Sequence, residues 1–140
     1  MLDILLMALE NFCIHQMRVP YQITSDVAQM RTVIASIEIE LLDGKKQRVY
    51  LGATLDFAQR VATLLLEEEE SDEQTLVDMM LETVNLIVGS AKVLAENTPY
   101  FAFNISTPNF EKIDIFDIMY DKAKVLKIQN DAIVLAIKEI

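Results

Sequence analysis

The stretch SDEQTLVDMMLETVNLIVGSAKVLAE, residues 71–96, has the hydrophobic period of a long α-helix and decides the fold prediction. Ser71 and Gln74 have the spacing of a capping box, which predicts a helix over about residues 72–96. One broad arc of this helix is apolar and is predicted to face the core: Leu76, Val77, Met80, Val84, Ile87, Val88, Ala91, Leu94 and Ala95.

The opposite arc of the helix carries mostly polar side chains. Its members are Asp78, Glu82, Asn85, Gly89, Lys92 and Glu96. Glu82 and Asn85 are one turn apart, and Asp78 comes one turn before Glu82, so a carboxylate and a carboxamide are presented side by side. On spacing alone, this row is also what an ordinary solvated helix face contains.

A thinner apolar stripe between the two arcs consists of Met79, Leu86 and Val93. It has two interpretations. The stripe packs against a neighbouring helix or strand, or Met79 and Leu86 flank the polar row on a surface that binds a partner.

The chain on both sides of this helix predicts further helices and strands. Before it we expect a helix within residues 1–17, a loop over 22–29, strands over 32–42 and 46–52 joined by a turn at Asp43-Gly44, and a helix over 55–66. After it we expect strands over 100–106, 113–120, 122–129 and 132–138, with a turn at Asn130-Asp131. This order predicts one α+β domain, residues 1–140, with an antiparallel sheet packed against two or three helices.

Composition excludes several classes of function. The formal net charge of −10 argues against nucleic acid and anionic membranes as partners.

Cys13 is the only cysteine, so an internal disulfide and a zinc site of several thiolates are excluded, and a reducing cytoplasm fits. Cys13 and His15 face different directions on a helix and are not expected to form a nucleophilic pair. The run Glu67 to Glu70 is expected to be a solvated connection.

The first 17 residues are apolar but are interrupted by polar side chains and lack a basic leading segment. We therefore expect an amphipathic helix there, neither a signal peptide nor a membrane span, and a cytoplasmic protein.

Two segments resemble a known family. The stretch from Asp78 to Lys92, with Glu82, Asn85 and a Gly-x-Ala at residues 89–91, resembles the active-site helix of the CheX/CheC/FliY chemotaxis phosphatases. Ile105-Ser106-Thr107-Pro108 is similar to the Ile-Ser-x-Pro segment of CheX proteins. CheC and FliY carry two Glu-x-x-Asn motifs and this chain has one, which favours a CheX-like member. Ser90 stands where the family commonly has Asn.

The resemblance implies a phosphatase that hydrolyses the aspartyl-phosphate of a CheY-type response regulator. Asn85 would hold a water in line with the phosphoryl group, Glu82 would pair with a Lys of the regulator, and Asp78 would support Glu82. This chain would bind no cofactor, since the Mg²⁺ belongs to the regulator. A homodimer is expected, because CheX-like proteins join their sheets and residues 122–138 would leave an exposed sheet edge.

Two other functions compete with this one. The first is a non-catalytic binding or scaffold module of the chemotaxis or flagellar switch that shares the fold. The second is a protein that captures the phosphorylated regulator without hydrolysing it. The intact pair of Glu82 and Asn85 favours the enzyme.

Overall fold

The computed structural model describes residues 1–26, 29–97 and 102–140. Its elements, in chain order, are α1 (Leu2–Asn11), the π-helical segment η1 (Phe12–Met17), β1 (Gln22–Thr24), β2 (Arg31–Leu41), β3 (Lys46–Thr54), α2 (Leu55–Leu66), α3 (Glu73–Glu96), β4 (Phe103–Ile105), β5 (Asn109–Ile115), β6 (Lys122–Ile128) and β7 (Asp131–Glu139). The predicted α+β class is confirmed. No helix among these residues is long and apolar enough to span a membrane.

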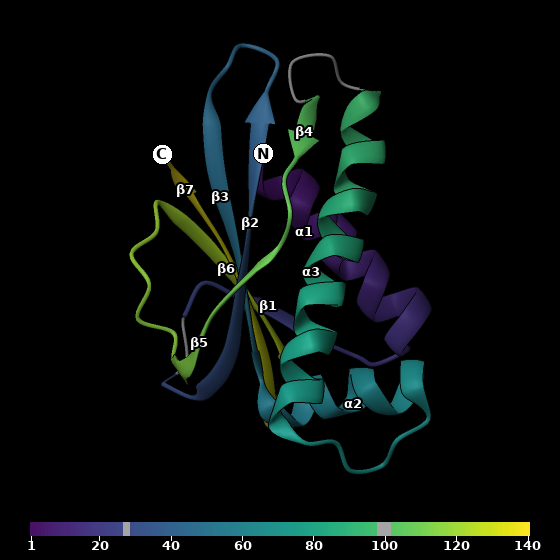
Figure 1. The fold of residues 1–140 in the computed structure, drawn as a ribbon. Helices are drawn as coiled ribbons and strands as arrows, with labels where there is room; N and C mark the ends of the chain where they lie inside the picture. The colour runs from purple at the N-terminus through teal and green to yellow at the C-terminus, as the bar shows by residue number, and fades with distance from the viewer. Residues whose placement is uncertain (27–28, 98–101) are drawn as a thin grey trace.

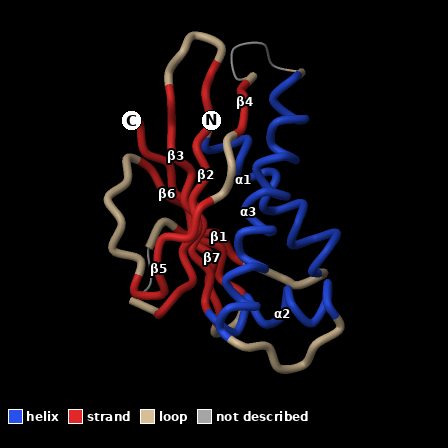
Figure 2. Tube along the Cα trace, viewed as in Figure 1, coloured by secondary structure: helices blue, strands red, loops and turns tan. Residues whose placement is uncertain are grey.

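The strands form one antiparallel sheet in the order β1-β6-β7-β3-β2-β4. Figure 2 shows the strands together on one side of the molecule and the helices on the other. β4 and β5 follow one another along the same edge of β2, because β3 occupies the other edge. The turn predicted at Asp43-Gly44 joins β2 to β3, and Gly44 has the positive φ of 87° that favours glycine.

Ser106 explains how one edge of β2 is covered by two separate strands. Its hydroxyl accepts a hydrogen bond from the backbone N–H of Glu38 (3.0 Å) and donates one to the carbonyl of Glu38 (3.0 Å). Pro108, two residues later, has no N–H to offer the ladder. Residues 105–108 thus hold the chain against β2 while they interrupt the strand.

The helices cover one face of the sheet (Figure 1). Alternation within β2 directs Val33, Ala35 and Ile37 into the large core shared with the helices. Ile34 points to the opposite face, into a smaller cluster with Tyr50, Phe116, Val125, Ala132, Val134 and Ala136. The chain after β5 covers this second face, where the ring of Phe116 lies so close to Gly52 that a Cβ there would be 2.7 Å from Phe116 Cδ2.

The long helix forms as predicted, but its N-terminal cap differs. Asp72 is the N-cap, and its Oδ1 accepts a hydrogen bond from the backbone N–H of Thr75 (2.8 Å). Ser71 is engaged elsewhere, because its N–H donates to Oε1 of Gln59 (2.8 Å) and its hydroxyl donates to Glu68 (2.9 Å). The capping box of Ser71 and Gln74 is therefore wrong, since an aspartate one residue later competes for the cap.

Three predictions before and after α3 need correction. The predicted first helix changes to π-helical geometry at Phe12 and ends before Arg18, whose φ is 54°. The predicted loop over 22–29 contains β1, whose residues Gln22–Thr24 pair with β6. The last turn lies at Gln129-Asn130 and not at Asn130-Asp131, because Gln129 takes the positive φ (56°) and Asp131 pairs with Ile128.

Two strands also differ from their predicted ranges. The strand predicted over 113–120 runs instead over Asn109–Ile115, because pairing with β2 sets its bounds and the chain then leaves to place Phe116 over the sheet. The strand predicted over 100–106 is observed as Phe103–Ile105, and residues 100–101 lie outside the described residues.

The expected exposed edge at residues 122–138 is wrong for most of its length. β7 is an interior strand between β6 and β3, and β1 covers β6 at Val125–Lys127. On the outer edge of β6, Lys122–Lys124 and Ile128 have no strand partner among the described residues.

Candidate active site

The helix α3 is fixed by its buried face. It packs on β2, with α1 beside it and α2 near its N-terminal end (Figure 1). Of the nine residues predicted for this face, eight are buried and Leu94 is partly buried against the core. The backbone that carries the surface side chains of α3 is therefore held in a fixed position and rotation.

The predicted site residues lie on the outward face of α3. Asp78, Glu82 and Asn85 are all exposed. Asp78 accepts a hydrogen bond from Nε2 of Gln74 (3.0 Å), one turn earlier. The side chains of Glu82 and Asn85 form no hydrogen bond or ion pair with any residue that the structure describes. The two side chains are thus available to groups of another molecule.

Thr83 lies beside this pair and is fully buried, which sequence analysis missed. Its hydroxyl donates to the carbonyl of Met79 (2.6 Å) within α3. A threonine can occupy a buried helix position when its hydroxyl donates to a carbonyl of the preceding turn. In the sequence, only the place of Thr83 on the apolar arc could have indicated that it is buried. Thr83 has a structural role here, between the predicted site residues.

The apolar stripe divides into two kinds of residue. Met79 is partly buried and packs against the core, as the first interpretation expects. Leu86 and Val93 are 44% and 62% exposed. Leu86 therefore remains the stripe residue next to Asn85 that a partner can reach.

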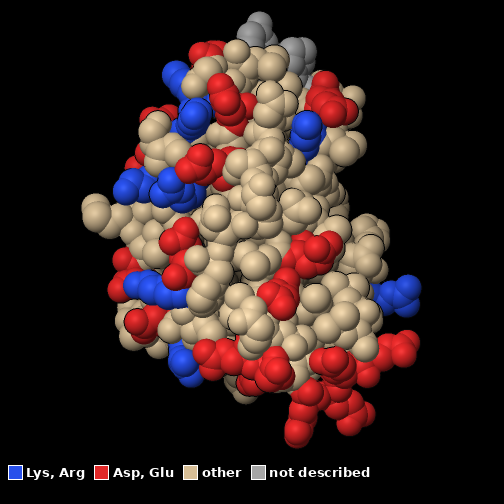
Figure 3. Space-filling model, in the orientation of Figure 1, with Lys and Arg blue, Asp and Glu red and all other residues tan. Residues whose placement is uncertain are grey.

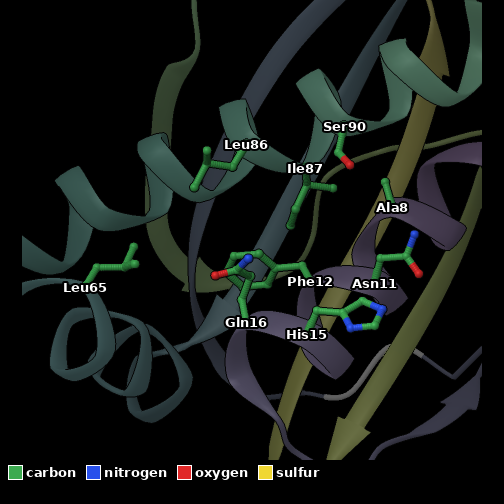
Figure 4. Close-up of a pocket in the computed structure, with 9 residues that line it drawn as sticks. All are labelled: Ala8, Asn11, Phe12, His15, Gln16, Leu65, Leu86, Ile87 and Ser90. Carbon is green, nitrogen blue, oxygen red and sulfur yellow. The ribbon is translucent and has the colours of Figure 1, made fainter.

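A pocket of about 410 Å³ opens beside Leu86 (Figure 4). Its lining comes from α1 and η1 (Ala8, Asn11, Phe12, His15, Gln16), α2 (Leu65) and α3 (Leu86, Ile87, Ser90). Its apolar lining comes from Ala8, Phe12, Leu65, Leu86 and Ile87, and its polar side chains come from α1, η1 and α3. Sequence analysis missed this pocket because its walls come from segments far apart in the chain.

Comparison with known proteins assigns this arrangement to a family. A family model described as "Chemotaxis phosphatase CheX" matches residues 35–128, more than half of the chain. The chain belongs to the CheX family. No curated protein matches the chain by sequence.

Solved structures of CheX proteins share its fold. A CheX chemotaxis protein from Vibrio vulnificus is 18% identical, with a TM-score of 0.78 over 97% of this chain and 95% of that one. One from Desulfovibrio desulfuricans is 17% identical, with a TM-score of 0.77 over 99% and 97%. The CheX chain of a "CheX-CheY-BeF3-Mg+2 complex" from Borrelia burgdorferi is 17% identical, with a TM-score of 0.68 over 99% and 97%. At these identities, the likeness shows the fold.

The two segments that carry the CheX resemblance lie in different parts of the fold. The Glu-x-x-Asn motif lies outward on α3, and Ser90, which departs from the usual Asn, lines the pocket beside Leu86. The Ile-Ser-Thr-Pro segment attaches the edge strands to β2 through Ser106. The motif that faces solvent and the segment that holds the sheet thus have separate physical roles.

Cys13 and His15 form no nucleophilic site in this CheX chain. Cys13 is fully buried, and burial, with a smaller contribution from Glu10, raises the pKa of its thiol to about 12. The thiol is therefore protonated at neutral pH and inert. His15 is exposed at the pocket, on a different side of the helix.

Acidic side chains dominate the surface near the start of α3. Glu67–Glu70 are exposed in the connection from α2, and Figure 3 shows the acidic group at that end of the molecule. Among the residues that the structure describes, no three His, Cys, Asp or Glu side chains are placed to hold a metal ion. These carboxylates act as a solvated, negatively charged surface.

Proposed function

We propose that this CheX-family protein hydrolyses the aspartyl-phosphate of a CheY-type response regulator. The observation that carries the proposal is the exposed pair of Glu82 and Asn85 on a helix whose other face is buried. The family match and the CheX–CheY complex from Borrelia burgdorferi support the choice of reaction and of partner.

Asn85 is the proposed catalytic residue. A carboxamide both donates and accepts hydrogen bonds, so it can bind a water and hold one lone pair toward the phosphorus. The task is positioning, because phosphoryl transfer needs an in-line nucleophile more than it needs proton abstraction in the transition state. A carboxamide on a rigid helix suits this task better than one on a mobile loop.

Glu82 is the proposed docking carboxylate. It would form a charge-assisted hydrogen bond with a Lys of the regulator and so fix the register of the two proteins. Asp78 would support it by adding negative charge one turn away, although its carboxylate already accepts from Gln74. The Mg²⁺ is expected on the regulator, and this chain supplies no ligand to it.

Leu86 is the proposed apolar contact of this surface, with Met79 contributing from its partly buried position. Leu86 both neighbours Asn85 and lines the pocket, so it would pack against the regulator beside the inserted side chains. Such an interface needs no membrane, and a cytoplasmic location fits it.

The decisive experiment measures inorganic phosphate released from an acetyl-phosphate-charged regulator with Mg²⁺. The protein should accelerate release over the regulator's own decay, and Asn85→Ala should abolish the acceleration. A capturing protein would slow the decay, and a scaffold module would leave it unchanged. Either of these results with every cognate regulator overturns the proposal.

We also propose that the protein is a homodimer. The outer edge of Lys122–Lys124 in β6, which pairs with no strand among the described residues, would offer backbone groups to a second copy. Light scattering at micromolar concentration should give twice the chain mass of 15.9 kDa. A mass of one chain under these conditions would contradict this proposal without affecting the reaction.

A further inference from the structure

Gly89 is the one glycine of the chain for which the described structure shows no internal reason. The sequence has three glycines. Gly44 has a positive φ of 87° in its hairpin turn, and a Cβ on Gly52 would collide with Phe116 at 2.7 Å. A Cβ on Gly89 would meet no heavy atom within 4 Å other than those of its two chain neighbours and of the helix's own backbone. The packing of this chain therefore accepts a side chain at residue 89.

A glycine at position 89 lowers the stability of the helix. It lies well inside α3, and glycine in a helix interior is less stable than alanine because it loses more backbone freedom on folding. Replacing Gly89 by alanine would thus stabilise the folded chain. A benefit outside the chain itself can offset this cost.

The geometry of α3 indicates what that benefit is. Gly89 lies one turn after Asn85 on the same outward row. The Cα–Cβ bond in a helix tilts toward the N-terminus, so a side chain at residue 89 would cover the turn that carries Asn85. Without it, the space beside the Asn85 carboxamide stays open.

We propose that Gly89 is a specificity-determining residue that leaves clearance for the docked response regulator beside Asn85. This inference rests on the proposed function, because it assumes that the regulator approaches this row. The regulator's surface would contact the α3 backbone at Gly89, which allows Asn85 to reach the phosphoryl group. A side chain there would hold the regulator away from the helix.

The test compares Gly89→Ala and Gly89→Leu with wild type in stability and in binding. Both variants should unfold at higher denaturant concentration than wild type. Affinity for the regulator activated with beryllofluoride and Mg²⁺ should fall for Gly89→Leu by about tenfold or more, and by less for Gly89→Ala. The loss should appear as a raised KM in phosphate release.

Glu96→Leu is the matched control, because it puts the same leucine on the same row two turns beyond Gly89, where it covers the turn of Lys92. Glu96→Gln measures the effect of the lost charge alone. Neither control should weaken binding to the extent of Gly89→Leu.

Separate outcomes decide the two proposals. If Gly89→Leu binds the activated regulator as wild type does, the clearance role is overturned while the phosphatase stands. If the wild type binds without hydrolysis and Gly89→Leu binds more weakly, the clearance role stands while the phosphatase fails. If the wild type binds no cognate regulator, both are overturned.

Discussion

Two groups of polar side chains in this protein differ in whether their hydrogen-bond partners lie within the chain. At the start of α2, Asp131 is 7% exposed, accepts a hydrogen bond from the Thr54 hydroxyl (3.1 Å) and pairs with Nε of Arg60 (3.3 Å). On α3, Glu82 and Asn85 are exposed and have no side-chain partner among the described residues. The first cluster is complete within the chain, and the second requires another molecule.

The presence or absence of partners within the chain separates structural polar residues from functional ones. Removing a member of the first cluster leaves a buried partner unsatisfied and should cost stability. Removing a member of the second leaves nothing unsatisfied in the chain and should cost activity alone. Substitutions in the two groups test this separation.

Asn85→Ala is expected to have the largest effect. Hydrolysis of the charged regulator should fall by about a hundredfold or more, because the group that positions the water is lost. Binding and stability should change little, since Glu82 still docks and Asn85 is exposed. Phosphate release, with circular dichroism as the control for folding, checks this. A fully active Asn85→Ala would remove the proposed mechanism.

Asp131→Ala should have the next largest effect, and it should affect stability and not activity. It should lower the free energy of unfolding by about 1–3 kcal/mol, because the buried Thr54 hydroxyl loses its acceptor and Arg60 loses its ion pair. Urea denaturation measures the loss, and kcat at a temperature where the variant is folded should match wild type. A large fall in kcat of the folded variant would break the separation of the two groups.

Glu82→Ala should raise the dissociation constant for the regulator about tenfold and also slow turnover, because a charge-assisted contact is deleted. Titration of the activated regulator checks this. Glu82→Gln should recover part of the affinity, since its oxygen still accepts a hydrogen bond. An unchanged dissociation constant would show that Glu82 belongs to a merely solvated face.

Leu86→Ala is expected to have the smallest effect. Affinity should fall by about fivefold, and the fold should survive because the side chain is 44% exposed. The readouts are binding and thermal unfolding. A large loss of stability would show that Leu86 packs within the fold, as the first interpretation of the stripe expects.

The fold could be predicted in segments whose apolar residues recur at the spacing of a single kind of element, helix or strand. The buried face of α3 and the β2–β3 hairpin follow directly from apolar spacing and from the turn at Gly44. The three-residue strand β1 could not be predicted, because its pairing with β6 and not its own sequence makes it a strand. The cap at Asp72 was missed because two adjacent residues both fit that role.

The site was predictable in part for a similar reason. Glu82 and Asn85 lie on one helix, so spacing alone places them together on its outward face. The pocket beside Leu86 is lined by α1, η1, α2 and α3, and no local pattern indicates which of their faces meet. The open space at Gly89 likewise required the positions of all neighbouring atoms.

The interrupted strand along β2 has a further consequence for how the protein behaves at high concentration. A long, flat outer strand would be a template for another chain to add to, and such addition leads to aggregation. Here the edge is divided into β4, with three residues, and β5, with seven, by the Ser106–Pro108 segment. The same hydroxyl that holds the chain to Glu38 therefore also limits the length of ladder that a misfolded neighbour could extend.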